Sequence, residues 1–223
     1  MKAIRIDQFG GPEVLQLREV EDPVAPEGGF VVVDVRAAGL NYADTHQAEN
    51  SYLAPSQLPL IPGGEVVGTT PDGRRIVSLV QGGGYAEKAV VHPVASWEVP
   101  DGVSDGQALA LVLQGTTAWH LLRTSAQLRQ GESVVVHAAA GGVGTLAIQL
   151  AKRFGAGRVI GVASSDDKRA LATRLGADAV VDSRAQDLTA ALREANGGER
   201  VGVVLEMAGG RVVEQSLQAL APF

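Results

Sequence analysis

The sequence predicts an α/β protein in two parts: a β-rich domain, then a domain built on a parallel sheet. Two observations support this. Short apolar runs divided by Gly and Pro fill roughly the first hundred residues, whereas strand-like and helix-like runs alternate from about Gly131 onward. We place the boundary at residue 120, giving domains 1–120 and 121–223. A helical pattern from Ser104 to Leu128 is expected to bridge them.

In the first domain, apolar or alternating runs predict strands, and Gly and Pro clusters predict the turns between them. The strands are expected at residues 1–5, 31–35, 75–80 and 85–92, and the turns at 26–29, 62–64, 71–73 and 82–84. Short strands separated in this way indicate a barrel or a sandwich.

In the second domain, strands and helices alternate, which is typical of a parallel sheet with right-handed crossovers. Strands are expected at residues 133–137, 158–163, 179–182 and 201–206, and helices at 143–154, 166–175, 188–195 and 211–222. The first helix is the clearest, because its apolar residues recur at helical spacing and form a single stripe.

Composition excludes several classes of function. The net charge is −6, from 19 Lys and Arg against 25 Asp and Glu, without a basic stripe, so nucleic-acid binding is not expected. No apolar run approaches the ~18 residues that span a bilayer, and no signal-peptide core is present, so we expect a cytoplasmic protein with no membrane partner. Because the chain has no cysteine, disulfides, a thiol nucleophile and cysteine-ligated zinc are excluded.

A glycine-rich loop joins the strand at 133–137 to the clearest helix. The loop holds Gly141, Gly142, Val143 and Gly144, a variant of the G-x-G-x-x-G fingerprint with Ala139 at the first glycine position. A loop of this kind brings backbone N–H groups and a helix N-terminus to a pyrophosphate. The sequence therefore predicts a Rossmann-type dinucleotide domain. Such a sheet usually has six strands, so the four counted here predict a C-terminally incomplete one, with an unpaired edge after the helix at 211–222 that favours self-association.

The end of the second strand indicates which dinucleotide binds. NAD-binding folds usually place an acid there, but this chain has Ser164 and Ser165, with Lys168 just beyond. Hydroxyls and a cation suit a 2′-phosphate, which favours NADP(H). Two alternatives stay open. In the first, Ser165 only caps the helix and Lys168 is only a surface charge. In the second, Asp166 or Asp167 binds the 2′-hydroxyl of NAD.

Five ordered segments carry a family resemblance: residues 39–44, 60–68, 83–87, 114–119 and 137–144. They resemble landmarks of the zinc-independent quinone oxidoreductase branch of the medium-chain dehydrogenase/reductase family. The resemblance implies a GroES-like domain before the Rossmann-type domain. Zinc members of the family carry metal ligands where this chain has Asn41 and Gly64, so no metal site is expected.

Residue by residue, the resemblance assigns Asn41 and Thr117 to the nicotinamide, residues 141–144 to the pyrophosphate, and Ser164 and Lys168 to the adenosine 2′-phosphate. A tyrosine that helps bind this phosphate in some relatives is matched by Ser183. A homodimer is also expected.

The implied reaction is hydride transfer from NADPH to a quinone or an enone. Without zinc, hydrogen-bond donors must polarise the acceptor, and the candidate catalytic residues are Asn41, Tyr42, His46 and Tyr52. Each also has a structural interpretation: a turn for Asn41, packing for the tyrosines and surface exposure for His46. Asp44 is expected to bond backbone amides, and His137 to be a satisfied core histidine. The alternative functions are a non-catalytic NADP(H)-binding redox sensor and an inactive truncated product.

Overall fold

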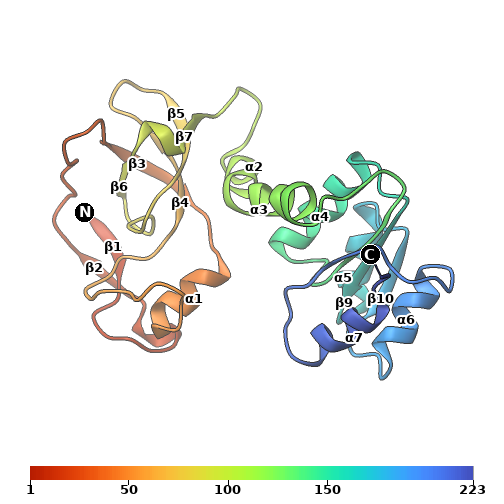
Figure 1. Ribbon diagram of the computed structural model, residues 1–223. Helices are drawn as coiled ribbons and strands as arrows, with labels where there is room; N and C mark the ends of the chain where they lie inside the picture. The colour runs from red at the N-terminus through yellow and green to blue at the C-terminus, as the bar shows by residue number, and fades with distance from the viewer. Residues whose placement is uncertain (223) are drawn as a thin grey trace. The chain divides into compact units, whose positions relative to one another are not determined.

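The computed structural model describes residues 1–222 (Figure 1). The chain forms two compact units, Met1–Leu113 and Gln114–Phe223. Their boundary falls within the helical stretch that the sequence predicts between residues 104 and 128. In the described part of the chain, no helix combines the length and the apolar character needed to cross a membrane.

The first unit is β-rich, as the sequence predicts. Strands β1 (Lys2–Arg5) and β2 (Gln16–Glu19) form an antiparallel pair. A five-stranded antiparallel sheet has the order β6-β3-β4-β5-β7. Its strands are β3 (Val31–Ala38), β4 (Glu65–Thr69), β5 (Arg75–Leu79), β6 (Lys88–Val91) and β7 (Ser96–Glu98).

Apolar residues on alternate positions give this sheet two buried faces. On one face, Val33, Val66 and Ile76 pack together. On the other, Val67 and Val77 pack against Leu109 of helix α2 (Asp105–Ala110), which begins with a capping box between Ser104 and Gln107. Helix α1 (Tyr42–Glu49) lies in the connection from β3 to β4 (Figure 1).

The second unit opens with a helical stretch made of α3 (Thr116–His120) and the wider π-type turns Leu111–Gly115 and Leu121–Ser125, the first of which begins in the preceding unit. A parallel sheet follows, with the order β10-β9-β8-β11. Its strands are β8 (Ser133–Val136), β9 (Arg158–Ala163), β10 (Ala179–Asp182) and β11 (Val203–Leu205), and its helices are α4 (Gly142–Arg153), α5 (Asp166–Arg174), α6 (Leu188–Ala195) and α7 (Arg211–Ala219).

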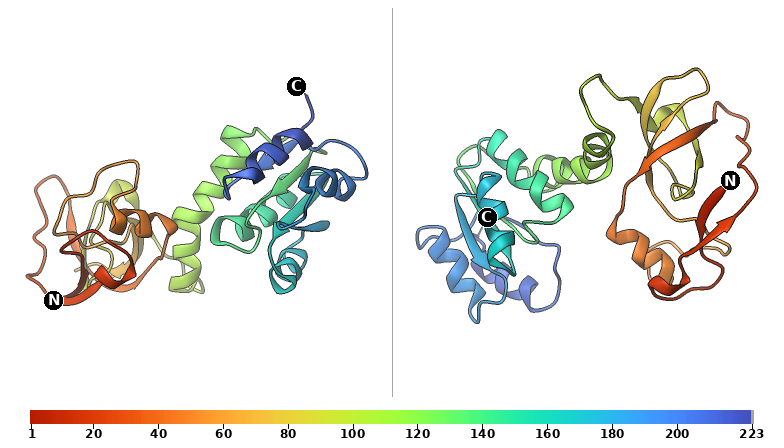
Figure 2. Two further views of the ribbon diagram at one scale, coloured as in Figure 1. Left: turned by 90° about the horizontal axis from the view of Figure 1, so that it is seen from below. Right: turned by 180° about the vertical axis from the view of Figure 1, so that it is seen from behind.

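Helices cover both faces of this parallel sheet, which is the doubly wound arrangement (Figures 1 and 2). One core cluster joins the sheet to α3, α4 and α5 and includes Ala147, Ile148 and Ala172. The other joins it to α6 and α7 and includes Leu192 and Ala219. The order places β8 and β9 at the centre, so the glycine loop after β8 lies beside the end of β9.

The end of α7 corrects one expectation. The helix ends at Ala219 rather than at residue 222, because Leu220 has extended backbone dihedrals and pairs in parallel with Val201. The Val201 N–H donates to the Ala219 carbonyl at 3.0 Å, and the Ala221 N–H donates to the Val201 carbonyl at 2.9 Å. The sequence predicts an unpaired edge at the last strand of the parallel sheet. This prediction is wrong at Val201, just before β11, because Leu220 pairs with it.

Candidate functional site

The glycine loop turns sharply between β8 and α4. Ala138 has φ +45°, in the left-handed region, and the Gly141 N–H donates back to the Ala138 carbonyl at 2.8 Å. The Ala139 N–H is anchored on the Val162 carbonyl of β9 at 3.0 Å. The turn therefore ends with Gly141 capping α4, and the N–H groups of residues 142–144 have no partner within the helix. Free N–H groups and the positive end of the helix dipole form an anion site.

Gly144 allows the closest contact in this loop. A Cβ atom at Gly144 would lie 2.3 Å from the Ala138 carbonyl oxygen, which is backbone and cannot move aside locally. A Cβ atom at Gly142 would also meet an atom at 2.3 Å, but that atom is Oε1 at the end of the flexible Gln114 side chain. Gly144 is thus required by the backbone of the turn itself, as the fingerprint predicts.

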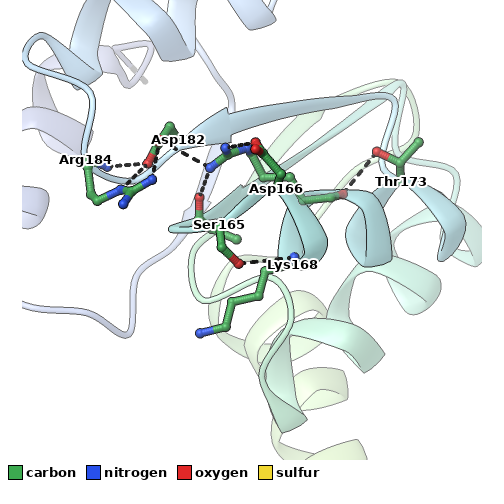
Figure 3. Close-up of polar contacts among 8 residues, drawn as sticks. Ser165, Asp166, Lys168, Thr173, Asp182 and Arg184 are labelled. Carbon is green, nitrogen blue, oxygen red and sulfur yellow. Dashed lines mark hydrogen bonds and ion pairs between the residues drawn. The ribbon is translucent and has the colours of Figure 1, made fainter.

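The end of β9 presents the residues predicted to select NADP(H). Ser165 is the N-cap of α5, and its Oγ accepts from the Lys168 backbone N–H at 3.4 Å. Ser164 is half-buried and Lys168 is exposed. The Lys168 side chain extends from the first turn of α5 and makes none of the ion pairs found among residues 1–222 (Figure 3).

A second set of charges lies at the same edge, and the sequence did not predict it. Asp182, the last residue of β10, pairs with Arg169 Nη1 at 3.3 Å and with Arg184 Nη2 at 3.1 Å (Figure 3). The hydrogen bonds from Arg184 lower the pKa of Asp182 to about 2. Arg169 also donates to the Ala163 carbonyl at 2.9 Å and pairs with Asp166.

This pairing bears on the choice of dinucleotide. The Asp166 carboxylate is already bound by Arg169, on the same helix. An acid that binds the 2′-hydroxyl of NAD needs free acceptor oxygens. The pair uses only Oδ1 of Asp166, whose side chain is 99% exposed, so Asp166 stays an alternative ligand of the 2′-hydroxyl. Lys168 is a cation without an ion pair in the first turn of the same helix.

In the first unit, Asn41 belongs to a buried polar network. Asn41 is the N-cap of α1, and its Nδ2 donates to Oε1 of Glu65 at 2.8 Å. Glu65, at the start of β4, is only 1% exposed. Burial raises the pKa of Glu65, although hydrogen bonds from Asn41 and from the Leu113 backbone oppose the shift. A Cβ atom at position 39 would meet this carboxyl group at 2.0 Å, which explains Gly39.

Asp44 and Tyr85 extend the network. Asp44 Oδ2 accepts from the Asn41 backbone N–H at 2.8 Å, which confirms that Asp44 bonds the backbone, and from the Tyr85 hydroxyl at 2.5 Å. Burial, together with the Asp44 carboxylate, raises the pKa of Tyr85, so the phenol stays neutral and donates. Tyr85 lies in a turn rather than in the strand predicted at 85–92, which begins only at Lys88. Its backbone is fixed there by Pro62, whose carbonyl accepts from the Tyr85 N–H at 2.9 Å.

The other candidate catalytic residues lie outside this network. Tyr42 is 79% exposed and contacts His46 edge to face, with ring centroids 4.9 Å apart. His46 Nδ1 is 2.9 Å from Ser51 Oγ. Tyr52 is also exposed, so the packing interpretation fails for both tyrosines. Thr117 is exposed on α3, in the second unit.

The expected core histidine is found. His137 is 1% exposed, and its Nε2 is 2.9 Å from Ser216 Oγ on α7. Burial lowers the pKa of His137, which keeps the ring neutral. Its role is structural, as predicted.

The raised pKa of Glu65 leads to a stability prediction. A buried acid with a raised pKa holds its proton in the folded state at pH values where the unfolded chain has released it. Wild-type stability should therefore fall as pH rises from about 4.5 toward the folded pKa of Glu65. Glu65→Gln keeps an oxygen that accepts from Asn41 but does not titrate. Urea unfolding across pH 4.5–8 should show the variant gaining stability relative to wild type as pH rises. A difference that does not change with pH would contradict the burial of this carboxyl group.

Comparison with known proteins places the chain in a family. Residues 27–101 match the alcohol dehydrogenase GroES-like domain, and residues 142–223 match the family described as zinc-binding dehydrogenase. A quinone oxidoreductase of Pseudomonas aeruginosa is 36% identical, over 99% of this chain and 70% of that protein. The chain belongs to the medium-chain dehydrogenase/reductase family. The human quinone oxidoreductase is 31% identical, over 93% of this chain and 66% of that protein.

Solved structures of family members match the fold of almost this entire chain. The Thermus thermophilus quinone oxidoreductase, studied alone and with NADPH, has a TM-score of 0.89 and 40% identity, covering 99% of this chain and 71% of that chain. The Escherichia coli quinone oxidoreductase in complex with NADPH has a TM-score of 0.92 and 33% identity, covering 99% of this chain and 70% of that chain. Both the GroES-like unit and the Rossmann-type parallel sheet are therefore established, the latter with four strands in the described part of the chain.

Sequence reasoning missed four functional candidates: Glu65, Tyr85, Arg169 and Arg184. For Glu65 and Arg184 a signal existed. An acid inside the apolar run Gly64–Gly68 is unusual for a buried strand, and Arg184 directly follows Ser183, a position that the family resemblance links to the 2′-phosphate. Tyr85 and Arg169 gave no comparable signal, because their partners lie 41 and 13 residues away.

Proposed function

We propose that this protein is an NADPH-dependent reductase that transfers hydride to a quinone or an enone without a metal ion. The observation that carries the proposal is the pairing of two features in the second unit. A glycine loop offers free backbone N–H groups, and Lys168 offers an unpaired cation at the end of the neighbouring strand β9. The NADPH complexes of the Thermus and Escherichia relatives support this choice of cofactor.

The residues present fit NADP(H). Backbone N–H groups at residues 142–144 would hold the pyrophosphate, and Ser164, Ser165 and Lys168 would hold the 2′-phosphate. When bound, the cofactor supplies a hydride from C4 of its nicotinamide ring. The protein's contribution is to fix the dinucleotide on rigid strand ends, because the barrier to hydride transfer depends on alignment.

For the nicotinamide end of the cofactor, the family resemblance implies two ligands, Asn41 and Thr117, and we propose each of them separately. Glu65 fixes the orientation of the Asn41 amide, because one N–H of that amide donates to Oε1 of Glu65. Tyr42 is exposed and its ring contacts that of His46, which is half-buried, so we keep both as proposed donors of the proton that accompanies hydride transfer.

Isotope transfer tests the reaction class. NADPH carrying deuterium at C4 should deliver one deuterium to the β-carbon of an enone, detected by mass spectrometry. With a quinone, deuteration should slow NADPH oxidation. Tight NADPH binding without oxidation by any acceptor would instead support the non-catalytic redox sensor.

Activity is predicted to be independent of metal ions. The reasons are the replacement of family zinc ligands by Asn41 and Gly64 and the absence of cysteine. Dialysis against EDTA should leave the rate unchanged, and elemental analysis should find no stoichiometric zinc. Loss of activity in EDTA that added zinc restores would overturn the metal-free assignment.

Light scattering of the purified chain tests the homodimer, which remains a prediction.

A further inference from the structure

A second exposed cation lies at the strand edge that holds Ser164 and Ser165. Arg184 follows β10 directly and has a side chain that is 69% exposed. β10 runs parallel to β9 with Asp182 opposite Ala163, and the Ser183 N–H donates to the Ala163 carbonyl at 3.3 Å. The backbone after β10 therefore lies beside the backbone after β9.

Asp182 holds the Arg184 guanidinium by one edge only. Arg184 Nε is 3.2 Å from Asp182 Oδ1, and Nη2 is 3.1 Å from Oδ2 (Figure 3). The Arg184 backbone N–H also donates to Asp182 Oδ1 at 2.9 Å. Among the hydrogen bonds of residues 1–222, none uses Nη1 of Arg184. The outer edge of a planar guanidinium, formed by Nη1 and Nη2, is thus available to a second oxyanion.

Arg169, the other arginine at this edge, is already committed. Its side chain is 16% exposed, and its two terminal nitrogens bind the Ala163 carbonyl, Asp166 and Asp182. Arg169 therefore fixes the end of β9 to Asp182, and Asp182 in turn fixes Arg184. Lys168, after β9, and Arg184, after β10, are both exposed cations on these adjacent strand ends.

We propose that Arg184 binds the adenosine 2′-phosphate of NADP(H) together with Lys168, and that Asp182 positions it. This inference rests on the proposed function, because it assumes an NADP(H) site. A phosphate monoester carries close to two negative charges at neutral pH and accepts paired hydrogen bonds from a guanidinium.

Calorimetric titration with 2′,5′-ADP and with 5′-AMP isolates the contribution of the 2′-phosphate without requiring turnover. Arg184→Gln should weaken 2′,5′-ADP binding about 10- to 100-fold, the loss typical of a charged hydrogen-bond partner, and leave 5′-AMP binding unchanged. Arg184→Lys keeps the charge without the planar fork, so its loss should be smaller. Arg174→Gln is the matched control, because Arg174 is exposed at the far end of α5.

Two results would overturn the inference: the first leaves the NADP(H) assignment standing, and the second overturns that assignment as well. If Arg184→Gln binds 2′,5′-ADP as tightly as Arg174→Gln does, Arg184 is not a ligand, while the NADP(H) assignment stands. If the unmodified chain binds 2′,5′-ADP no more tightly than 5′-AMP, the 2′-phosphate site itself is absent and the proposed cofactor is wrong.

Discussion

Replacing Gly144 by alanine is expected to destabilise the second unit by about 3 kcal/mol, as overpacking against fixed backbone does. The new Cβ atom would lie 2.3 Å from the Ala138 carbonyl oxygen and 2.9 Å from the Ala139 Cα, so the turn after β8 would have to shift. The same shift should abolish measurable NADPH binding, because the N–H groups of α4 would move. Urea denaturation followed by circular dichroism measures the first effect, and calorimetry measures the second.

Gly142→Ala is the matched control for this change. It adds the same methyl group to the same turn of α4, but the group that it meets is the end of the Gln114 side chain. Rotation of that side chain relieves the contact, so the free energy of unfolding should change by less than about 1 kcal/mol. Equal losses for the two variants would show that the approach of the helix to the Ala138 backbone is not what requires glycine.

Lys168→Glu should weaken NADPH binding by about 1.5–3 kcal/mol while leaving NADH binding almost unchanged. The variant removes the unpaired cation in the first turn of α5 and places a carboxylate where a 2′-phosphate would lie. NADH lacks this phosphate and should not sense the change. Arg174→Glu makes a comparable charge reversal near the other end of α5 and should affect neither cofactor. Calorimetry with both cofactors measures each difference.

The preference of the unmodified chain for NADPH or NADH can contradict the role assigned to Lys168. If it binds NADH as tightly as NADPH, or more tightly, the serines and Lys168 do not select the phosphorylated cofactor. Asp167, which is exposed beside Lys168 and makes none of the ion pairs found in residues 1–222, would then be the acid to test against the ribose 2′-hydroxyl.

Three strands of the parallel sheet were predictable to within a residue, whereas β11 (Val203–Leu205) is shorter than the strand predicted at 201–206. β9 and β10 have the predicted bounds, because each is an apolar run followed by a polar turn and a capped helix. Gly155 and Gly176 have φ +83° and +111°, which is why glycine marked the helix ends so clearly.

The first unit was less predictable, for physical reasons. All four residues of β2 are exposed, so the strand has no alternation of apolar and polar residues to detect. Helix α1 buries only Ala48, and it is defined by its capping contacts rather than by an apolar stripe. Strand β4 was missed because Glu65 interrupts the apolar pattern, and only the structure shows that Asn41 donates to Oε1 of this buried carboxyl group.

The candidate site also has a part that the sequence predicts and a part that it does not. The glycine loop and Ser165 were predictable because their roles follow from local backbone chemistry, a tight turn and a helix cap. Arg169 and Arg184 were not, because their position depends on Asp182 and on the parallel pairing of β9 with β10. Long side chains that meet across neighbouring strands leave no periodic pattern in a sequence.

Whether the protein is a metal-independent NADPH reductase is measured by steady-state oxidation of NADPH, followed by its absorbance in the presence of EDTA. A panel of quinones and enones serves as acceptors, and NADH replaces NADPH in a parallel series. We expect oxidation that depends on the acceptor, with a kcat/KM for NADPH at least about tenfold above that for NADH, as one charged contact supplies. Acceptor-dependent oxidation that favours NADH, or no oxidation of bound NADPH by any acceptor, would contradict this expectation.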